Sequence, residues 1–348
     1  MKQNLLLFGC LLFGAFLWSA PGPGQKPAQE EPQKDSQTIR VKVEMVSLPV
    51  VVTTRDGRRV TDLEKGDFQV FEDRAPQQIE GFSATDEPVS IALALDCSGS
   101  MQQRLARLQN EAIRFVNLLH PDDSVAVMSF ADDVNLLEDF SLDRKRNAYG
   151  IKETRSEGNT ALYEAVWLGL EEVLKPIKER KALVVFTDGV DTASRRASMK
   201  ETMDLAKESQ APIYSIYFNT ERDMESSRRT GQVIGGIPLP GPPVIGSPVP
   251  TTGPGSSASE YMQGRLYLSQ LGEYSGGMLF DALKMDDLGP AFESIAHELA
   301  STYSLGYYST NPKRDGKFRT VEVKVRRPGL VVRTKKGYVA PKETKPSK

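Results

Sequence analysis

The middle of the chain alternates short, wholly apolar runs with segments in which apolar residues recur at helical spacing. The runs 91–95 and 183–186 contain no charged residue, which is typical of parallel strands covered by helices on both faces. Further strands are predicted at 124–130, 134–140, 212–218 and 278–281. Helices are predicted at 105–119, 161–174, near 198–209, near 261–274 and in the stretch that ends at 300. This alternation predicts an α/β domain with a doubly wound, mostly parallel, Rossmann-like sheet.

Both ends of the chain show a different pattern, the strict alternation of apolar and polar residues that predicts half-exposed strands. It covers 39–46 and 67–72 near the start, and 303–308 and 319–325 near the end. Pro328-Gly329 predicts a hairpin turn, after which 330–333 returns as a strand. Because an isolated hairpin is only marginally stable in water, we expect the two terminal segments to pair into one small all-β, sandwich-like module. The α/β domain would then be inserted between its two halves.

The start of the chain has the pattern of an export signal. Met1-Lys2 is followed by an uncharged apolar run from 5 to 18 and then by Ser19-Ala20. That run is shorter than the roughly 20 residues that span a bilayer, so it predicts a cleaved signal peptide, with retention as an N-terminal anchor as the alternative. We therefore expect a secreted protein, or one of the periplasm or cell envelope. The predicted order is a signal peptide (1–20), a disordered linker (21–38), the first part of the β module (39–86), the α/β domain (87–301) with a Pro/Gly-rich insertion (221–261), the second part of the β module (302–340) and a disordered tail (341–348).

Composition and charge argue against some classes of function. A formal net charge of -2 over 348 residues gives no electrostatic attraction for nucleic acid or for an anionic membrane. Of the two cysteines, Cys10 would leave with the signal peptide, so Cys97 is expected to be a buried thiol without a disulfide partner. The two histidines, His120 and His297, are expected to be structural. After the signal peptide, no apolar run is long enough to span a bilayer.

Oxygen-bearing side chains gather in three segments: Asp96-Cys97-Ser98-Gly99-Ser100, Gly158-Asn159-Thr160 and Thr187-Asp188-Gly189. Asp96 directly follows the apolar run 91–95, and Asp188 follows the run 183–186 by one residue. Because the carboxyl ends of parallel strands meet at one edge of a sheet, both aspartates are expected at that edge. Taken singly, the serines and the threonine could cap helices, and Asp188-Gly189 could be an ordinary turn.

This pattern of D-x-S-x-S, a later threonine, and a later aspartate followed by glycine resembles the metal-ion-dependent adhesion site (MIDAS) of the von Willebrand factor type A (VWA) domain. All five positions of the signature are filled, and the resemblance covers residues 89 to about 301. It implies that Asp96, Ser98, Ser100 and Thr160 surround the ion, with Asp188 close by and acting through water. More narrowly, the whole mature chain resembles the bacterial VWFA-related family of secreted proteins.

The terminal segments carry this narrower resemblance. The stretches concerned are Val60-Thr61-Asp62-Leu63, Asp67-Phe68, Phe71-Glu72-Asp73, Gly306-Tyr307-Tyr308, Gly316-Lys317-Phe318-Arg319 and Gly337-Tyr338. The chain departs from the family at Arg74, where a turn glycine after Glu-Asp is more usual. This departure puts only the local turn in question.

The types of ligand set the expected ion and partner. Carboxylate, hydroxyl and water oxygens suit Mg²⁺, with Mn²⁺ or Ca²⁺ as alternatives, and the sequence has no Cys/His cluster with zinc spacing. If Asp188 acts through water, the ion stays under-neutralised, and an Asp or Glu carboxylate of a partner protein would complete its shell. The predicted function is a secreted, adhesion-type protein-binding module, and not an enzyme.

Two other functions stay open from the sequence. One is a structural component of the cell envelope, in which the ion stabilises the sheet edge and binds no partner. The other is a hydrolase that uses the ion to activate water, with Asp191 or Glu164 as the candidate base. The Pro/Gly-rich insertion could be a recognition arm beside the ion or a segment without a role, and the basic pair Arg195-Arg196 is expected to be solvated surface.

Overall fold

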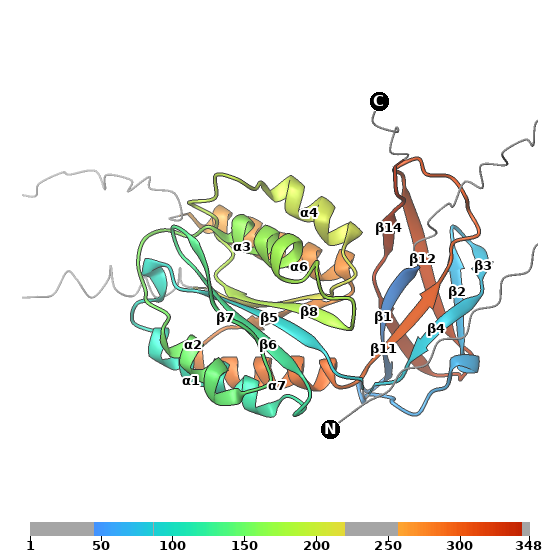
Figure 1. Ribbon diagram of the computed structural model, residues 1–348, viewed down its shortest axis with the longest axis horizontal. Helices are drawn as coiled ribbons and strands as arrows, with labels where there is room; N and C mark the ends of the chain where they lie inside the picture. The colour runs from blue at the N-terminus through green and yellow to red at the C-terminus, as the bar shows by residue number, and fades with distance from the viewer. Residues whose placement is uncertain (1–44, 86, 220–256, 343–348) are drawn as a thin grey trace, which may run out of the picture. The chain divides into compact units, whose positions relative to one another are not determined.

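Six strands form the central sheet of the computed structural model, in the order β10-β9-β8-β5-β6-β7 (Figure 1). Their bounds are β5 (Ser90–Asp96), β6 (Ser124–Phe130), β7 (Val134–Ser141), β8 (Lys181–Thr187), β9 (Ile213–Phe218) and β10 (Met278–Ala282). All neighbours in this sheet are parallel except β6 and β7. The predicted α/β fold with a mostly parallel sheet is therefore confirmed, and β5 and β8 lie side by side at its centre.

The structure describes residues 45–85, 87–219 and 257–342. The predicted signal peptide (1–20), the linker (21–38), nearly all of the strand at 39–46, most of the insertion at 221–261 and the tail from 343 lie outside the described residues. All described residues belong to one structural unit, Val43–Lys348.

Helices cover both faces of the central sheet (Figure 1). One face carries α1 (Leu105–Leu118), α2 (Arg144–Lys152) and α7 (Leu288–Leu299). The other face carries α3 (Leu162–Leu168), its π-helical continuation η3 (Gly169–Val173), α4 (Met199–Glu208) and α6 (Ala258–Ser275). Short 3₁₀ helices are η1 (Lys65–Asp67), η2 (Gly99–Met101) and η4 (Met285–Asp287).

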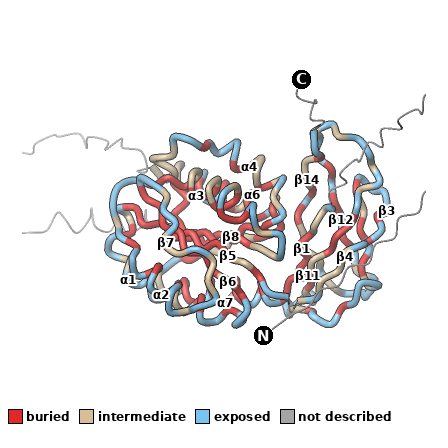
Figure 2. The backbone as a smooth tube through the Cα atoms, in the orientation of Figure 1, coloured by how far each residue is buried: buried red, intermediate tan, exposed pale blue. Residues whose placement is uncertain are grey.

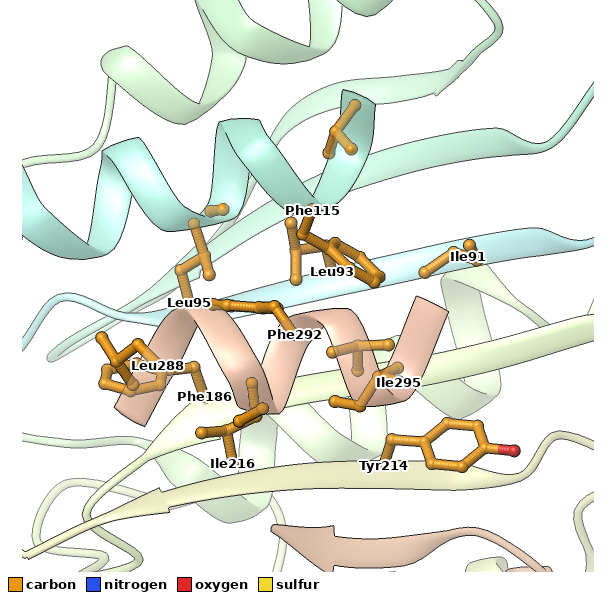
Figure 3. Close-up of a cluster of buried hydrophobic side chains, with 14 of the residues drawn as sticks. Ile91, Leu93, Leu95, Phe115, Phe186, Tyr214, Ile216, Leu288, Phe292 and Ile295 are labelled. Atoms are coloured by element: carbon orange, nitrogen blue, oxygen red, sulfur yellow. The ribbon is translucent and has the colours of Figure 1, made fainter. Parts of the chain in front are cut away.

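Alternate residues of β5 enter two different apolar layers, because successive side chains of a strand point to opposite faces of the sheet. Ile91, Leu93 and Leu95 belong to the layer that holds Phe115 of α1 and Phe292 of α7 (Figure 3). The alanines between them enter the layer beneath α3 and α6. The strand is buried from 91 to 96 (Figure 2), and each large apolar side chain stabilises the fold by roughly 1.5–3 kcal/mol. This framework fixes the point at which β5 and β8 end.

Strands from both ends of the chain form two further antiparallel sheets, in the orders β13-β1-β11-β4 and β14-β12-β2-β3. Their bounds are β1 (Val46–Thr54), β2 (Phe68–Glu72), β3 (Ala75–Gln77), β4 (Ile79–Ser83), β11 (Thr302–Tyr307), β12 (Phe318–Val325), β13 (Leu330–Thr334) and β14 (Gly337–Val339). In the first sheet β1 pairs with β11 and β13, and in the second β2 pairs with β12. The N-terminal and C-terminal strands are therefore interleaved in both sheets.

A buried carboxylate joins these terminal segments. Glu72 is 2% exposed and accepts hydrogen bonds from the hydroxyls of Tyr307 (2.9 Å), Tyr338 (2.9 Å) and Ser309 (2.7 Å). Glu72 lies on β2, Tyr307 on β11 and Tyr338 on β14, so one side chain links the two sheets. Three of the short motifs that carry the resemblance at the chain ends thus meet at one point.

The predicted hairpin at Pro328-Gly329 is wrong. β12 pairs with β2 and β14, whereas β13 pairs with β1, so the two strands belong to different sheets. The reason is apolar burial, since Leu330 and Val332 of β13 pack against the core that the two sheets share. A turn signal fixes where the chain reverses and does not fix which strand becomes the neighbour.

Two helical predictions need correction, and one helix was not predicted. The helix expected at 161–174 is α-helical only to Leu168 and continues as π-helix to Val173. Helix α2 was not predicted, because its nine residues include few apolar ones. Helix α6 begins at Ala258 and not near 261, because Ser257 and Glu260 form a capping box that satisfies its first amides.

The turn at Arg74 between β2 and β3 is left-handed at two successive residues. Asp73 has φ 45° and Arg74 has φ 69°, a conformation that favours glycine. Asp73 is held there by hydrogen bonds that its Oδ1 accepts from the backbone N and the hydroxyl of Thr320, both 2.9 Å. Arg74 thus occupies a strained position.

Candidate metal site

The ends of β5 and β8 place two aspartates at the same edge of the central sheet. These strands are parallel neighbours, with Leu95 opposite Phe186, so the next residues of each emerge together. Asp96 is the last residue of β5 and is fully buried, and Asp188 follows β8 and is 3% exposed. The placement expected from the apolar runs is the one that the structure shows.

Four of the five predicted ligands form a continuous chain of oxygen contacts. The Ser98 hydroxyl donates to Asp96 Oδ1 at 2.6 Å, and its Oγ lies 3.1 Å from Ser100 Oγ. The Ser100 hydroxyl in turn donates to Asp188 Oδ2 at 3.3 Å. Ser98 is buried and Ser100 partly buried, so these oxygens lie at the boundary between the core and solvent.

Thr160 lies beside this chain but is not hydrogen-bonded to it. Its segment is held against the serine loop by a hydrogen bond from Gly99 N to Gly158 O, 3.0 Å. Thr160 is 6% exposed, and within the described residues its hydroxyl has no hydrogen-bond partner. This oxygen is not among the buried side-chain atoms that lack a partner, so it is open to solvent at the edge of the sheet. Its oxygen is thus available to a ligand that the protein itself does not supply.

The simpler reading of these hydroxyls as helix caps is wrong. Ser98 precedes η2, but its side chain makes no capping bond and contacts Asp96. Helix α3 begins after Ala161, and its first amides are bound by Asp191 and Ser194, so Thr160 has no such role. Helix α1 likewise begins after Arg104 without a side-chain cap, although Ser100 is four residues away.

The carboxylate of Asp96 is electrostatically strained. Burial, and secondarily the neighbouring charge of Asp188, raise the pKa of Asp96 to about 7. Hydrogen bonds from Ser98 and Thr187 act in the opposite direction. A positive charge placed between the two carboxylates would offset both the desolvation and the repulsion.

Two supporting residues were missed in the sequence. Thr187 is fully buried; its hydroxyl donates to Asp96 Oδ2 at 2.7 Å and accepts from Gly189 N at 3.0 Å. It therefore fixes the Asp96 carboxylate and the turn that carries Asp188 together. Ser156 donates its hydroxyl to Ser98 O at 2.8 Å and holds the serine loop from the other side. For Thr187 the sequence offers one signal, a threonine at the end of a buried strand. For Ser156 no local pattern indicates a role.

Helix α6 packs directly against the turn that carries Asp188. Gly189 has φ 81°, which favours glycine, and a Cβ built on Gly264 of α6 would lie 2.2 Å from Gly189 O. Backbone therefore packs against backbone at this point, and neither residue has room for a side chain. The position of Asp188 depends on a glycine that lies far away in the sequence.

The donor set fits a hard divalent cation. It consists of two carboxylates and three hydroxyls, all oxygen, the ligands that Mg²⁺, Mn²⁺ and Ca²⁺ prefer. Within the described residues no three His, Cys, Asp or Glu side chains cluster as a metal site, so any ion here depends on the hydroxyls. Burial, followed by the Asp96 charge, raises the pKa of the Cys97 thiol to about 12, which keeps it protonated and unsuited to bind metal.

The residues considered as general bases are engaged elsewhere. Asp191 Oδ1 accepts from Tyr163 N (3.0 Å) and from the Ser194 hydroxyl (2.5 Å). Glu164 Oε1 accepts from Arg195 N (2.5 Å) and Arg196 N (2.6 Å). Both carboxylates thus fix the loop after Asp188 to the start of α3.

The two histidines lie away from the site. His120 follows the carboxyl end of α1, and His297 lies in the last turn of α7. Both helices follow a strand of the parallel sheet and run back toward its opposite edge, so their carboxyl ends lie far from Asp96. Neither imidazole is placed to exchange a proton at the oxygen chain.

Residues 91–190 match the family model of the von Willebrand factor type A domain, a segment that contains all five predicted ligands. The chain contains a VWA domain. Domains of this family generally mediate protein interactions, and many hold a divalent metal. Within the described ranges, no helix combines the length and apolar character needed to cross a bilayer.

This chain is distantly similar to several known proteins. An uncharacterised protein of Synechocystis sp. is 30% identical over 106 residues, which are 29% of this chain and 25% of that protein. This chain thus spans about a quarter of the length of that relative. A von Willebrand factor type A structure from Catenulispora acidiphila has 11% identity and a TM-score of 0.45, with 78% of this chain and 72% of that chain covered.

Two further solved structures are similar to parts of this chain. The conserved hypothetical protein BatB from Bacteroides thetaiotaomicron has 18% identity and a TM-score of 0.43, with 61% of this chain and 97% of that chain covered. Proximal thread matrix protein 1 from the mussel byssus, solved with zinc in its MIDAS motif, has 17% identity and a TM-score of 0.43, with 64% and 48% covered.

Proposed function

We propose that this chain is a metal-dependent protein-binding module of the adhesion type. Asp96, Ser98, Ser100 and Thr160 would hold a divalent cation, with Asp188 acting through water, and the cation would be Mg²⁺, with Mn²⁺ or Ca²⁺ as alternatives. An Asp or Glu carboxylate of a partner protein would be the remaining ligand. The observation that carries the proposal is the chain of oxygens from Asp96 to Asp188 beside the hydroxyl of Thr160, which is open to solvent and has no hydrogen-bond partner among the described residues.

Charge balance favours an anionic partner group. When bound, the cation supplies two positive charges and an open coordination position. The hydroxyls of this chain add no charge, and one of its two carboxylates, Asp188, already accepts hydrogen bonds from Ser100 and from Val190 N. A carboxylate from outside therefore completes the site better than a neutral group does.

The proposal also covers the location of the protein and whether it catalyses a reaction. We propose that the protein acts in the cell envelope or after secretion, on the strength of the signal-like segment 1–20. We propose no catalytic activity, since Asp191 and Glu164 are occupied by backbone amides and a hydroxyl.

The test is a binding measurement with a defined carboxylate. The mature chain is passed over an immobilised glutamate-containing peptide and over the same peptide with glutamine in its place, in Mg²⁺ and in EDTA. We expect binding only to the glutamate peptide in Mg²⁺, lost in Asp96→Ala and kept in Asp122→Ala, an exposed aspartate that follows α1. Binding that survives EDTA or Asp96→Ala would contradict the proposal.

The structural alternative gives a different result in the same experiment. If the ion only stabilises the sheet edge, chelation lowers the melting temperature, yet neither peptide binds in Mg²⁺. That pair of results would replace the adhesion function by a structural one.

A further inference from the structure

The loop that follows Asp188 presents two arginines beside the candidate metal site. Arg195 and Arg196 are both exposed. Within the described residues, neither guanidinium makes a hydrogen bond or an ion pair closer than 4 Å, and only the backbone amides of the two residues are hydrogen-bonded. The guanidinium of Arg195 acts through its charge, which contributes, after the hydrogen bonds from Asn159, to lowering the pKa of Asp132. Two cations thus face solvent without a close partner.

The loop is fixed on the Thr160 segment and does not merely pass near it. Thr192 N (2.9 Å) and Ala193 N (3.0 Å) both donate to Thr160 O, and Thr160 N donates to Thr192 Oγ1 at 2.9 Å. Arg195 and Arg196 follow within four residues of Thr192. The backbone just before the two arginines is therefore hydrogen-bonded to Thr160, a residue of the candidate metal site.

The far end of the loop is fixed as well. The backbone amides of Arg195 and Arg196 both donate to Glu164 Oε1, at 2.5 and 2.6 Å. Asp191 and Ser194 bind the first amides of α3 through Tyr163 N and Glu164 N. The arginine side chains are thus free while their backbone is held, an arrangement that presents charge at a defined place with little cost in backbone entropy on binding.

The acidic residues around the loop are already in use. Glu164 and Asp191 accept amide and hydroxyl hydrogen bonds, and Asp132 Oδ1 accepts from Asn159 N (3.0 Å) and Asn159 Nδ2 (2.8 Å). Asp133, which follows Asp132 in the connection between β6 and β7, is exposed. The local excess of unengaged charge on the loop itself is positive.

We infer that Arg195 and Arg196 select a partner segment with clustered carboxylates, in which one carboxylate reaches the metal and its neighbours pair with the two guanidiniums. This inference rests on the proposed function. Arginine suits the task because its planar guanidinium binds a carboxylate through two parallel hydrogen bonds. The loop therefore determines which acidic partners bind, while the metal site is required for any of them to bind.

The test compares two immobilised peptides, one with a single glutamate among glycine and serine and one with five consecutive glutamates, in Mg²⁺. Arg195→Ala/Arg196→Ala is expected to weaken binding of the five-glutamate peptide by about 2- to 30-fold, the range for two exposed ion pairs, and to leave the single-glutamate peptide unchanged. Arg195→Lys/Arg196→Lys should recover part of the loss. The matched control, Arg326→Ala/Arg327→Ala, removes the same charge from the connection between β12 and β13 and should have no effect.

The outcomes separate the inference from the proposed function. An unchanged preference for the five-glutamate peptide in the variant, or an equal loss in the control pair, would overturn the role of the loop while Mg²⁺-dependent binding persists. Failure of both peptides to bind the wild-type protein in Mg²⁺ would overturn the proposed function, and the inference with it. Raising the NaCl concentration should erase the difference between the two peptides, since exposed ion pairs are screened.

Discussion

The contact between Gly189 and Gly264 predicts a loss of metal affinity from a substitution that touches no ligand. In Gly264→Ala the new Cβ would lie 2.2 Å from Gly189 O, whereas ordinary contacts begin at 3.4 Å. Helix α6 and the turn that carries Asp188 must therefore separate by about 1.2 Å. Metal sites tolerate deviations of only about 0.2 Å in their ligand distances, so the shift displaces Asp188 from its working position.

The expected loss of metal affinity can be judged from residues in other metal sites that contact a ligand but not the metal. Removing a residue that orients a ligand commonly costs 10- to 100-fold in metal affinity, and we expect a loss in that range for Gly264→Ala. The free energy of unfolding should change less than the free energy of metal binding. Overpacking costs about 1–3 kcal/mol, and this is partly offset because alanine stabilises a helix by roughly 1 kcal/mol relative to glycine. A large loss of affinity with a small loss of stability is the expected signature.

The chain offers a matched control on the same helix. A Cβ on Gly272 would lie 2.7 Å from Met278 Cα, a clash with backbone near the carboxyl end of α6 and away from the turn at Gly189. Both variants are purified, their unfolding in urea is measured, and Mg²⁺ binding is followed by calorimetry. Gly272→Ala should keep the wild-type affinity. Wild-type affinity in Gly264→Ala, or an equal loss in Gly272→Ala, would refute the reasoning.

Three further predictions concern stability. Arg74→Gly should raise the unfolding free energy by about 0.5–1 kcal/mol, since it relieves a left-handed residue, whereas Arg74→Ala keeps the strain and should give no gain. Tyr338→Phe removes a hydrogen bond to the buried Glu72 and should cost about 1.5–3 kcal/mol in urea unfolding; an equal cost for the exposed Tyr308→Phe would contradict this. Burial lowers the pKa of Lys335 from 10.5 to about 8, so the folded state binds fewer protons than the unfolded state between these values, and stability should rise with pH there by about 3 kcal/mol. Lys335→Met should remove that rise, and a pH profile that is the same in both proteins would count against it.

The sequence predicts the central sheet and its edge because these follow from local patterns. Uncharged apolar runs mark β5 and β8, and an aspartate at the end of each marks the edge at which side chains meet solvent. Both features depend on a few consecutive residues, which is the range over which periodicity is informative. The candidate ligands could be named for the same reason.

The parts that were missed depend on contacts between distant residues. The apposition of Gly189 and Gly264 joins the turn after β8 to a helix on the far side of the undescribed segment, and no local pattern announces it. The hairpin at Pro328-Gly329 was wrong because the turn residues do not say that β13 will find β1. The sequence shows Thr187 as part of a motif. It does not show that the Thr187 hydroxyl donates a hydrogen bond to Asp96, because that contact depends on how β5 and β8 are aligned in the sheet.

We propose that the oxygens at the ends of β5 and β8 bind a divalent cation. Mn²⁺ is a suitable probe, since free Mn²⁺ gives an electron paramagnetic resonance signal that falls on binding. The protein without residues 1–20, its Asp96→Asn variant and the control Asp122→Asn are each titrated with Mn²⁺, and Mg²⁺ is then added as competitor. We expect one Mn²⁺ site in the wild type and in the control, displaced by Mg²⁺ and absent from Asp96→Asn. Mn²⁺ that stays free beside the wild-type protein, or that binds equally to Asp96→Asn, would contradict it.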